Sequence, residues 1–258
     1  MRTAYLDHPG PIPLAHRGFS TAGLENTMPA FAAAVDLGYR YVETDVHATR
    51  DGVLLAFHDQ TLDRVTDRTG DIPELSWREV SRARVLGTEP VPQLEDLLGS
   101  WPELRVNIDI KSQGAILPLV RVIERSRAHD RVCVTSFSDA RRQEAVMRLT
   151  RPVVTSAGQR TVAAFRAAAQ LPSLVRPSVV ARALRGVDGL QVPADRYGIE
   201  VVTPTTVEAA HETGKFVHVW TINDVPEMVQ LLDQGVDGIV TDRADLLKDV
   251  LVTRGQWH

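Results

Sequence analysis

Three acidic side chains are the first candidates for chemistry in this sequence. Glu43 and Asp45 lie two residues apart in an apolar, strand-like segment, and Asp109 lies in a second segment of the same kind. Side chains at positions i and i+2 of a strand point to the same side, so the first two carboxylates repel each other unless a cation or a shared proton intervenes. Three oxygen donors without a cysteine suit Ca²⁺ or Mg²⁺ better than zinc. The residues alone leave two alternatives open, a divalent-cation site or a buried ion-pair network with Arg17 and Lys111.

Two histidines, two basic residues and a tryptophan accompany these acids at the ends of predicted strands. Histidine takes and gives protons near neutral pH, so His16 and His58 beside a carboxylate cluster predict an acid/base pair, whereas each alone would be structural. Arg17 and Lys111 offer a planar fork and a point charge for phosphate oxygens, or else they balance the carboxylates. Trp220 ends a strand and is either the wall of a pocket or part of the barrel core.

Other polar residues fit ordinary structural roles. Asn223 and Asp242 occur where turns and helix caps are expected. The histidines expected to face solvent or to be incidental are His8, His47, His129, His211 and His258, whereas His218 shares a strand face with Trp220 and is expected to line the barrel.

The composition is that of a globular protein. The chain has 258 residues, of which 43% are hydrophobic and 24% charged, and 29 basic against 33 acidic residues give a net charge of −4. These values argue against a disordered or coiled-coil chain, and a mildly acidic balance argues against a nucleic-acid partner. The single cysteine, Cys133, excludes an intrachain disulfide and suits a reducing compartment.

The sequence contains no apolar run of the 18 or so residues that a membrane span needs. The first thirteen residues lack the basic-then-apolar pattern of a signal peptide. We therefore expect a cytoplasmic protein without stable insertion into a membrane.

Short strand-like runs alternate with helical patterns along nearly the whole chain, which is typical of α/β proteins. Eight strands are predicted, at residues 12–18, 41–49, 105–111, 131–137, 152–156, 190–192, 216–221 and 238–241, with an extension or hairpin return at 53–58. Helices are predicted at residues 29–37, 116–127, 140–149, 161–170, 207–213, 226–233 and 246–252. Eight strands with helices in about 250 residues predict a (β/α)8 TIM barrel, a single domain over residues 1–258.

The connection after the second strand is longer than usual for a βα loop. We expect an insertion at about residues 60–100, with helix-like stretches at 76–86 and 93–98, lying over the barrel mouth as a small lid.

Taken together, these residues resemble the glycerophosphodiester phosphodiesterase family, whose barrels are of the phospholipase C-like type. The resembling blocks occur in family order and span residues 14 to about 250. They are Ala15-His16-Arg17-Gly18, Glu25-Asn26-Thr27, Glu43-Thr44-Asp45-Val46, Asp51-Gly52, Phe57-His58-Asp59, Asp109-Ile110-Lys111, Trp220-Thr221-Ile222-Asn223 and the run 236–242.

The resemblance implies a role for each matching residue. His16 and His58 match the general acid/base histidines. The residues that match the metal carboxylates are Glu43, Asp45 and Asp109; those that match substrate contacts are Arg17, Lys111 and Trp220. Glu25 and Asn26 match a motif that supports the first loop. Asp109 departs from the family, which usually has Glu there; the shorter side chain falls about 1.5 Å short, so Asp109 is the least certain ligand.

The resemblance implies metal-dependent hydrolysis of a small glycerophosphodiester to an alcohol and glycerol 3-phosphate, with a cyclic phosphate intermediate. It leaves open whether the cation is Ca²⁺ or Mg²⁺, which histidine is the acid, and which alcohol is released.

Alternatives from other classes remain. One is a lysophospholipase D-like activity on lipids, in which Leu75, Trp77 and Leu86 of the insertion either contact an acyl chain or pack the insertion on the barrel. Another is a non-catalytic barrel that binds a phosphate ligand. An aldolase- or isomerase-like barrel is disfavoured, because Lys111 is the only lysine placed for a Schiff base.

Overall fold

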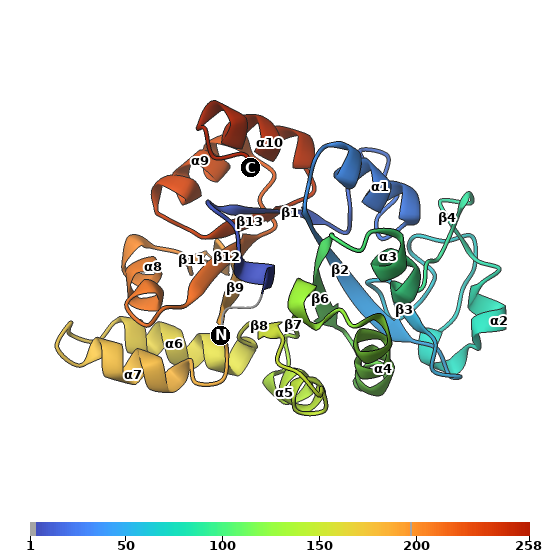
Figure 1. The fold of residues 1–258 in the computed structure, drawn as a ribbon, viewed down its shortest axis with the longest axis horizontal. Coiled ribbons are helices and arrows are strands. Elements are labelled where there is room, and N and C mark those ends of the chain that lie inside the picture. The colour runs from blue at the N-terminus through green and yellow to red at the C-terminus, as the bar shows by residue number, and fades with distance from the viewer. Residues whose placement is uncertain (1–3, 197) are drawn as a thin grey trace.

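The computed structural model describes residues 4–196 and 198–258, and in these residues eight parallel strands form a barrel (Figure 1). The strands are β1 (Ile12–His16), β2 (Tyr41–Ala48), β6 (Arg105–Ile110), β7 (Val132–Thr135), β8 (Val154–Thr155), β9 (Gly189–Pro193), β12 (Phe216–Trp220) and β13 (Gly238–Thr241). Their order in the sheet is β8-β7-β6-β2-β1-β13-β12-β9. A parallel bridge between Ser156 and Gly189 joins the two ends of this sheet and closes the barrel. The predicted fold class is confirmed.

Helices surround the barrel (Figure 1). They are α1 (Met28–Asp36), α4 (Ile116–Ser126), α5 (Asp139–Met147), α6 (Gln159–Ala169), α7 (Arg176–Ala183), α8 (Pro204–His211), α9 (Val225–Asp233) and α10 (Ala244–Thr253). Helix α7 and a short hairpin of β10 (Asp195–Arg196) and β11 (Ile199–Glu200) were not predicted from the sequence. Strand β3 (Leu54–Ala56) pairs antiparallel with β2, which confirms the expected hairpin return.

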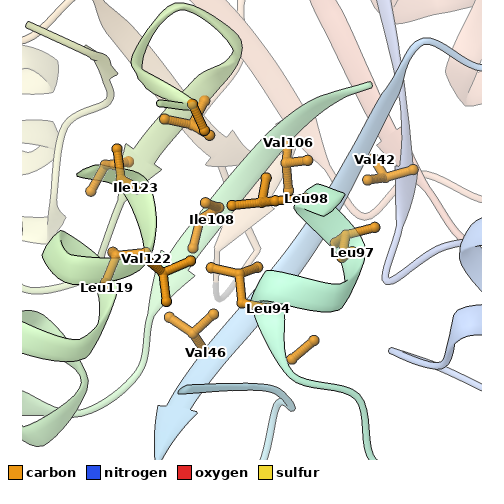
Figure 2. Close-up of a cluster of buried hydrophobic side chains, with 14 of the residues drawn as sticks. Val42, Val46, Leu94, Leu97, Leu98, Val106, Ile108, Leu119, Val122 and Ile123 are labelled. Atoms are coloured by element: carbon orange, nitrogen blue, oxygen red, sulfur yellow. The ribbon is translucent and has the colours of Figure 1, made fainter. Parts of the chain in front are cut away.

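Along each strand, side chains point alternately out of the barrel, toward the helices, and into the barrel. Val42 and Val46 of β2 and Ile108 of β6 point outward, where they pack against α4 and against α3 (Leu94–Ser100), as Figure 2 shows. Because side chains alternate along a strand, Glu43 and Asp45 must point into the barrel. Packing of the apolar outward side chains against the helices therefore fixes the acidic side chains on the inner face of the barrel.

The end of the barrel at the amino-terminal ends of the strands is packed with apolar and aromatic side chains. The short helix η1 (Ala4–Leu6) places Tyr5 there, and the Tyr41 hydroxyl donates to the Tyr5 carbonyl oxygen at 2.7 Å. Tyr5, Leu14, Tyr41 and Val240 belong to one buried cluster inside the barrel. These side chains fill the barrel interior beside η1. A separate cavity of about 540 Å³ opens at the same end, lined by residues that include Ile12, Phe216 and Asp237.

The insertion after β3 consists of η2 (Ile72–Glu74), α2 (Trp77–Val80), β4 (Arg84–Val85) and β5 (Glu89–Pro90), followed by α3. It has an apolar cluster of its own, which includes Leu62, Ile72 and Val80, and Figure 1 shows α2 and β4 at the side of the molecule. The helix expected at 76–86 is wrong in extent, because the chain leaves α2 after Val80 and turns into β4.

Among the helices in the described part of the chain, none is long and apolar enough to cross a membrane.

Closure of the barrel depends on a close approach at Gly189, which yields a stability prediction. A Cβ atom added at Gly189 would overlap the ring of Phe216, whereas one added at Gly99 in α3 meets nothing within 4 Å. We expect Gly189→Ala to lower the free energy of unfolding by about 1–3 kcal/mol through overpacking. Gly99→Ala, the control, should be neutral or slightly stabilising. Urea unfolding measures both, and equal midpoints for the two variants would contradict the prediction.

Candidate active site

The eight side chains that the sequence analysis singled out for the site line one cavity of about 150 Å³. They are His16, Arg17, Glu43, Asp45, His58, Asp109, Lys111 and Trp220. They come from β1, β2, β6 and β12 and from the residues just after β1, β3 and β6, at the end of the barrel to which the parallel strands run. In barrels of this class the loops at that end carry the chemistry.

Strand register brings the acids together. His16 on β1 pairs with Glu43 on β2, and Asp45 pairs with Asp109 on β6. The three acidic residues are at most 9% exposed. Because burial disfavours an isolated charge, each carboxylate must find a cation, a hydrogen bond or a proton.

Two basic side chains compensate Asp45 and Asp109. Lys111 Nζ lies 2.8 Å from Asp45 Oδ1 and 2.7 Å from Asp109 Oδ2, and Arg17 Nε lies 3.0 Å from Asp45 Oδ2. Burial alone would raise the pKa of Asp45, but Lys111 and then Arg17 outweigh it and lower this pKa. Asp109 has one cation rather than two, and burial raises its pKa.

Glu43, unlike the other two acids, forms no ion pair with Lys111 or with the Arg17 side chain. Its Oε2 atom accepts a hydrogen bond from the Arg17 backbone N–H at 3.3 Å and lies 3.7 Å from His16 Nε2. Burial, followed by the charge of Asp45, raises the pKa of Glu43 to about 8. Of the three acids, Glu43 is therefore the one whose negative charge is least compensated by neighbouring side chains.

Asp242 orients His16. His16 Nδ1 and Asp242 Oδ1 are 2.6 Å apart, and Asn223 Nδ2 donates to Asp242 Oδ2 at 2.8 Å. Burial opposes a charge on His16, but the hydrogen bond to Asp242 and the charge of Glu43 prevail and raise its pKa. The role expected for Asn223 and Asp242, turn or cap residues, is therefore incomplete. Their position at the carboxyl ends of barrel strands was the signal that could have revealed this contact.

His58 has its own carboxylate partner. His58 Nδ1 and Asp59 Oδ1 are 2.5 Å apart. The backbone carbonyl oxygen of His58 lies 3.1 Å from Nε2 of His47, which is buried, as is His129. The expectation that His47 and His129 face solvent is wrong, because both pack beneath the surface.

The loop after β1 reaches the site through a tight backbone path. Arg17 and Asn26 both have φ of 55°, and Gly18 has φ of 83°. A Cβ atom at Gly18 would lie 2.6 Å from the Ala30 carbonyl carbon, so only glycine fits there. Arg17 Nη1 donates to Glu25 Oε1 at 2.9 Å, which places Glu25 behind the loop as expected.

Trp220 lines the cavity and also packs against the cluster inside the barrel, so both roles weighed for it apply. Its ring meets that of Phe137 edge to face, with centroids 5.7 Å apart. Phe137, which is 47% exposed, also lines the cavity. It was not singled out from the sequence, because the candidates at strand ends were polar residues and one tryptophan.

The insertion does not contribute to the wall of the cavity, since residues 60–100 are all described and none of them lines it. Leu75 and Trp77 pack against the insertion's own apolar cluster. The expected lid is therefore not seen over the cavity in this structure.

The chemistry of the donors can be compared with the needs of a divalent cation. No group of three or more His, Cys, Asp or Glu side chains within residues 4–196 and 198–258 is already arranged to hold a metal ion, because Lys111 bridges two of the acids. Two features nevertheless fit a hard cation: Asp109 Oδ1 is buried without a hydrogen-bond partner, and burial beside Asp45 raises the pKa of Glu43, which nearby positive charge would lower.

Comparison with known proteins agrees with the geometry. The sequence profile of the glycerophosphoryl diester phosphodiesterase family matches residues 16–246. The chain is 46% identical over 254 residues to a probable glycerophosphodiester phosphodiesterase 2 of Mycobacterium tuberculosis, covering 98% of this chain and 95% of that protein. The chain belongs to the glycerophosphoryl diester phosphodiesterase family.

Solved structures show the same fold. A putative glycerophosphoryl diester phosphodiesterase from Silicibacter pomeroyi superposes with a TM-score of 0.80 at 23% identity, covering 99% of this chain and 100% of the other. A phosphodiesterase from Oleispira antarctica, solved with the product sn-glycerol-3-phosphate, gives 0.76 at 22% identity, with 94% and 97% covered. The resemblance drawn from the sequence blocks is thus confirmed, and the chain is a phosphodiesterase.

The position of Lys111 yields a prediction about stability. In Lys111→Met, buried carboxylates lose their shared cation, and we expect the free energy of unfolding at neutral pH to fall by about 3–5 kcal/mol. Because Asp45 has a lowered pKa in the folded state, its contribution is present above the ordinary aspartate pKa and disappears as the pH falls through the lowered value. The difference between variant and wild type should therefore shrink in acid.

Urea unfolding at several pH values measures this effect. Lys248→Met is the control, because Lys248 Nζ binds the Leu37 carbonyl oxygen far from the acids. A loss of stability that is the same at acidic and neutral pH would contradict the charge argument.

Proposed function

We propose that this chain hydrolyses glycerophosphodiesters to an alcohol and glycerol 3-phosphate, with His16 and His58 as the acid/base pair. The observation that carries the proposal is the convergence of both histidines, the three acids and the two basic residues on one cavity. Family membership supports it, and so does the product found in the related Oleispira enzyme.

Arg17 and Lys111 supply the positive charge for the phosphate. Both line the cavity and form ion pairs with acids. Arg17 pairs with Asp45 and Glu25. Lys111 pairs with Asp45 and Asp109. Side chains held in this way need little reorganisation when negative charge builds up on the phosphate oxygens. Trp220 forms a wall for the glycerol or the alcohol.

The reaction needs two proton transfers. One histidine removes the proton of the glycerol hydroxyl beside the ester, the hydroxyl oxygen attacks phosphorus, and the bond to the alcohol breaks as the other histidine protonates it. Attack within the substrate avoids the entropy of bringing two molecules together. Water then opens the cyclic phosphate with the two roles exchanged. Because Asp242 and Asp59 bind the Nδ1 atoms, Nε2 of each imidazole remains for the substrate.

A divalent cation, Ca²⁺ or Mg²⁺, bound by Glu43, Asp45 and Asp109 would add charge stabilisation at the phosphate. The unpartnered Oδ1 of Asp109 and the raised pKa of Glu43 support this choice of residues.

Replacement of either histidine tests the acid/base pair. His16→Ala and His58→Ala should each lower kcat by about 10²–10⁴ without loss of the folded state. His211→Ala is the matched control, because His211 is exposed and pairs with Asp237 away from the cavity. The assay follows release of glycerol 3-phosphate from glycerophosphocholine. Turnover near the wild-type value in both active-site variants would remove the proposed pair.

Removal of metal tests the cation. Dialysis against EDTA should lower kcat by at least about tenfold, and Ca²⁺ or Mg²⁺ should restore it. Undiminished activity of the chelated protein, with no residual metal by mass spectrometry, would contradict the proposed cation. Lys111 and Arg17 would then supply the positive charge for the phosphate.

A groove beside the cavity favours a second candidate, lysophospholipase D-like activity. This groove, of about 420 Å³, shares Phe137 and Trp220 with the cavity and continues along Val162 of α6 and Val192 of β9. Its lining is largely apolar, so an acyl chain would bury apolar surface there. Of the three insertion residues weighed for this role from the sequence, Leu75 and Trp77 pack in the insertion's own apolar cluster, and Leu86 is exposed but does not line the groove.

A charge in the groove separates the two candidates. If lysolipids are substrates, Val162→Glu should lower turnover of lysophosphatidylcholine more than that of glycerophosphocholine, because the carboxylate would have to be desolvated against the chain. Equal effects on the two substrates would argue against an acyl chain in the groove, and turnover of neither substrate by the wild type would favour the non-catalytic alternative.

A further inference from the structure

Arg64 of the insertion binds two carboxylates, those of Asp59 and Glu25, which contact different residues of the cavity. Its Nε atom lies 2.5 Å from Asp59 Oδ2 and its Nη2 atom 3.2 Å from Asp59 Oδ1. Its Nη1 and Nη2 atoms lie 2.9 Å and 2.7 Å from the two carboxylate oxygens of Glu25. One guanidinium group thus makes paired contacts with both acids.

Each of these acids touches a residue of the cavity. Asp59 binds Nδ1 of His58. Glu25 binds Nη1 of Arg17, and the Nε atom of the same arginine forms an ion pair with Asp45. The contacts form a continuous chain from the imidazole of His58 to the loop that follows β1. Arg64 is the link in this chain that comes from the insertion.

Arg64 also influences the ionisation of both acids. Burial opposes ionisation of Asp59, but Arg64 and then His58 lower its pKa to about 2. The pKa of Glu25 is lowered in the same way, by Arg64 and Arg17 against burial. Both acids are therefore fully ionised near neutral pH. Because they share the Nη2 atom of Arg64, they would repel each other if the guanidinium group were removed.

We propose that Arg64 is a positioning residue for the phosphodiesterase reaction, setting the orientation of the His58 imidazole and of the Arg17 guanidinium group through Asp59 and Glu25. The proposal rests on the function proposed above. Arg64 does not line the cavity, so it acts only through the two acids. The planar fork of arginine is required, because a lysine has a single nitrogen and cannot make paired contacts with both carboxylates.

The expected consequence is a loss of activity rather than of stability. Arg64 is 49% exposed, and exposed ion pairs contribute little to folding. A shift of catalytic groups by about 1 Å, in contrast, can cost about 10² in rate. The insertion therefore influences catalysis from the side of the barrel without covering the cavity.

The test uses Arg64→Ala and Arg64→Lys in the full chain, with Arg68→Ala as the matched control. Arg68 is an exposed arginine of the same segment, and its Nε atom donates to the Arg82 carbonyl oxygen. With glycerophosphocholine as substrate, we expect kcat of Arg64→Ala to fall by about 10² and its KM to rise, since both His58 and Arg17 are affected. Arg64→Lys should recover little, and Arg68→Ala should match the wild type.

Chemical rescue distinguishes positioning from a structural role. Millimolar guanidinium or methylguanidinium should restore part of the activity of Arg64→Ala and should leave Asp59→Asn unchanged, because the added ion needs both carboxylates. Activity of Arg64→Ala within twofold of an active wild type would overturn the proposal. A loss that accompanies a lowered melting temperature and resists rescue would overturn it as well. An inactive wild type would instead refute the proposed function on which it rests.

Discussion

The site depends on the burial of three acids inside the barrel together with the two basic residues that make this burial tolerable. Asp45 is 2% exposed, and Lys111 and Arg17 bind its two oxygens. Removing charges from water is costly, and only close opposite charges and hydrogen bonds repay the cost. Glu43 has no comparable ion pair, and burial and the charge of Asp45 raise its pKa, so additional positive charge would stabilise its ionised form most.

The backbone after β1 is shaped to keep Arg17 beside these acids. Arg17 and Asn26 adopt positive φ, and Gly18 lies against the backbone of Ala30 at the start of α1. The Asn26 side chain donates to Asp45 and accepts from Thr44. These conformations are uncommon for residues other than glycine, and hydrogen bonds to β2 help to maintain them. The loop and the acidic strand therefore support each other.

The two histidines are oriented by different parts of the chain. Asp242, at the end of β13, binds His16, whereas Asp59, next in sequence to His58, binds that imidazole and is itself bound by the insertion. In both cases a carboxylate takes the Nδ1 side of the ring, which directs Nε2 away from it. An imidazole held in this way has one nitrogen for proton transfer and a defined orientation.

The sequence by itself determined the barrel and most of the site. Alternating apolar and polar residues in β2 and β6 placed Glu43, Asp45 and Asp109 on the inner face, because apolar outward neighbours such as Val46 must meet helices. The carboxyl ends of the strands then placed the eight candidate residues at one mouth. These inferences depend on local periodicity and on the geometry of parallel sheets, both of which can be read from nearby residues.

Only the tertiary structure decided the contacts between residues far apart in the chain. The contact of His16 with Asp242, 226 residues away, and the two acids bound by Arg64 arise from closure of the barrel and from the path of the insertion. The same holds for the burial of His47, and for the Nζ atom of Lys111, which lies between Asp45 and Asp109. No local pattern encodes such pairs, because the distance between two side chains depends on how every intervening element packs.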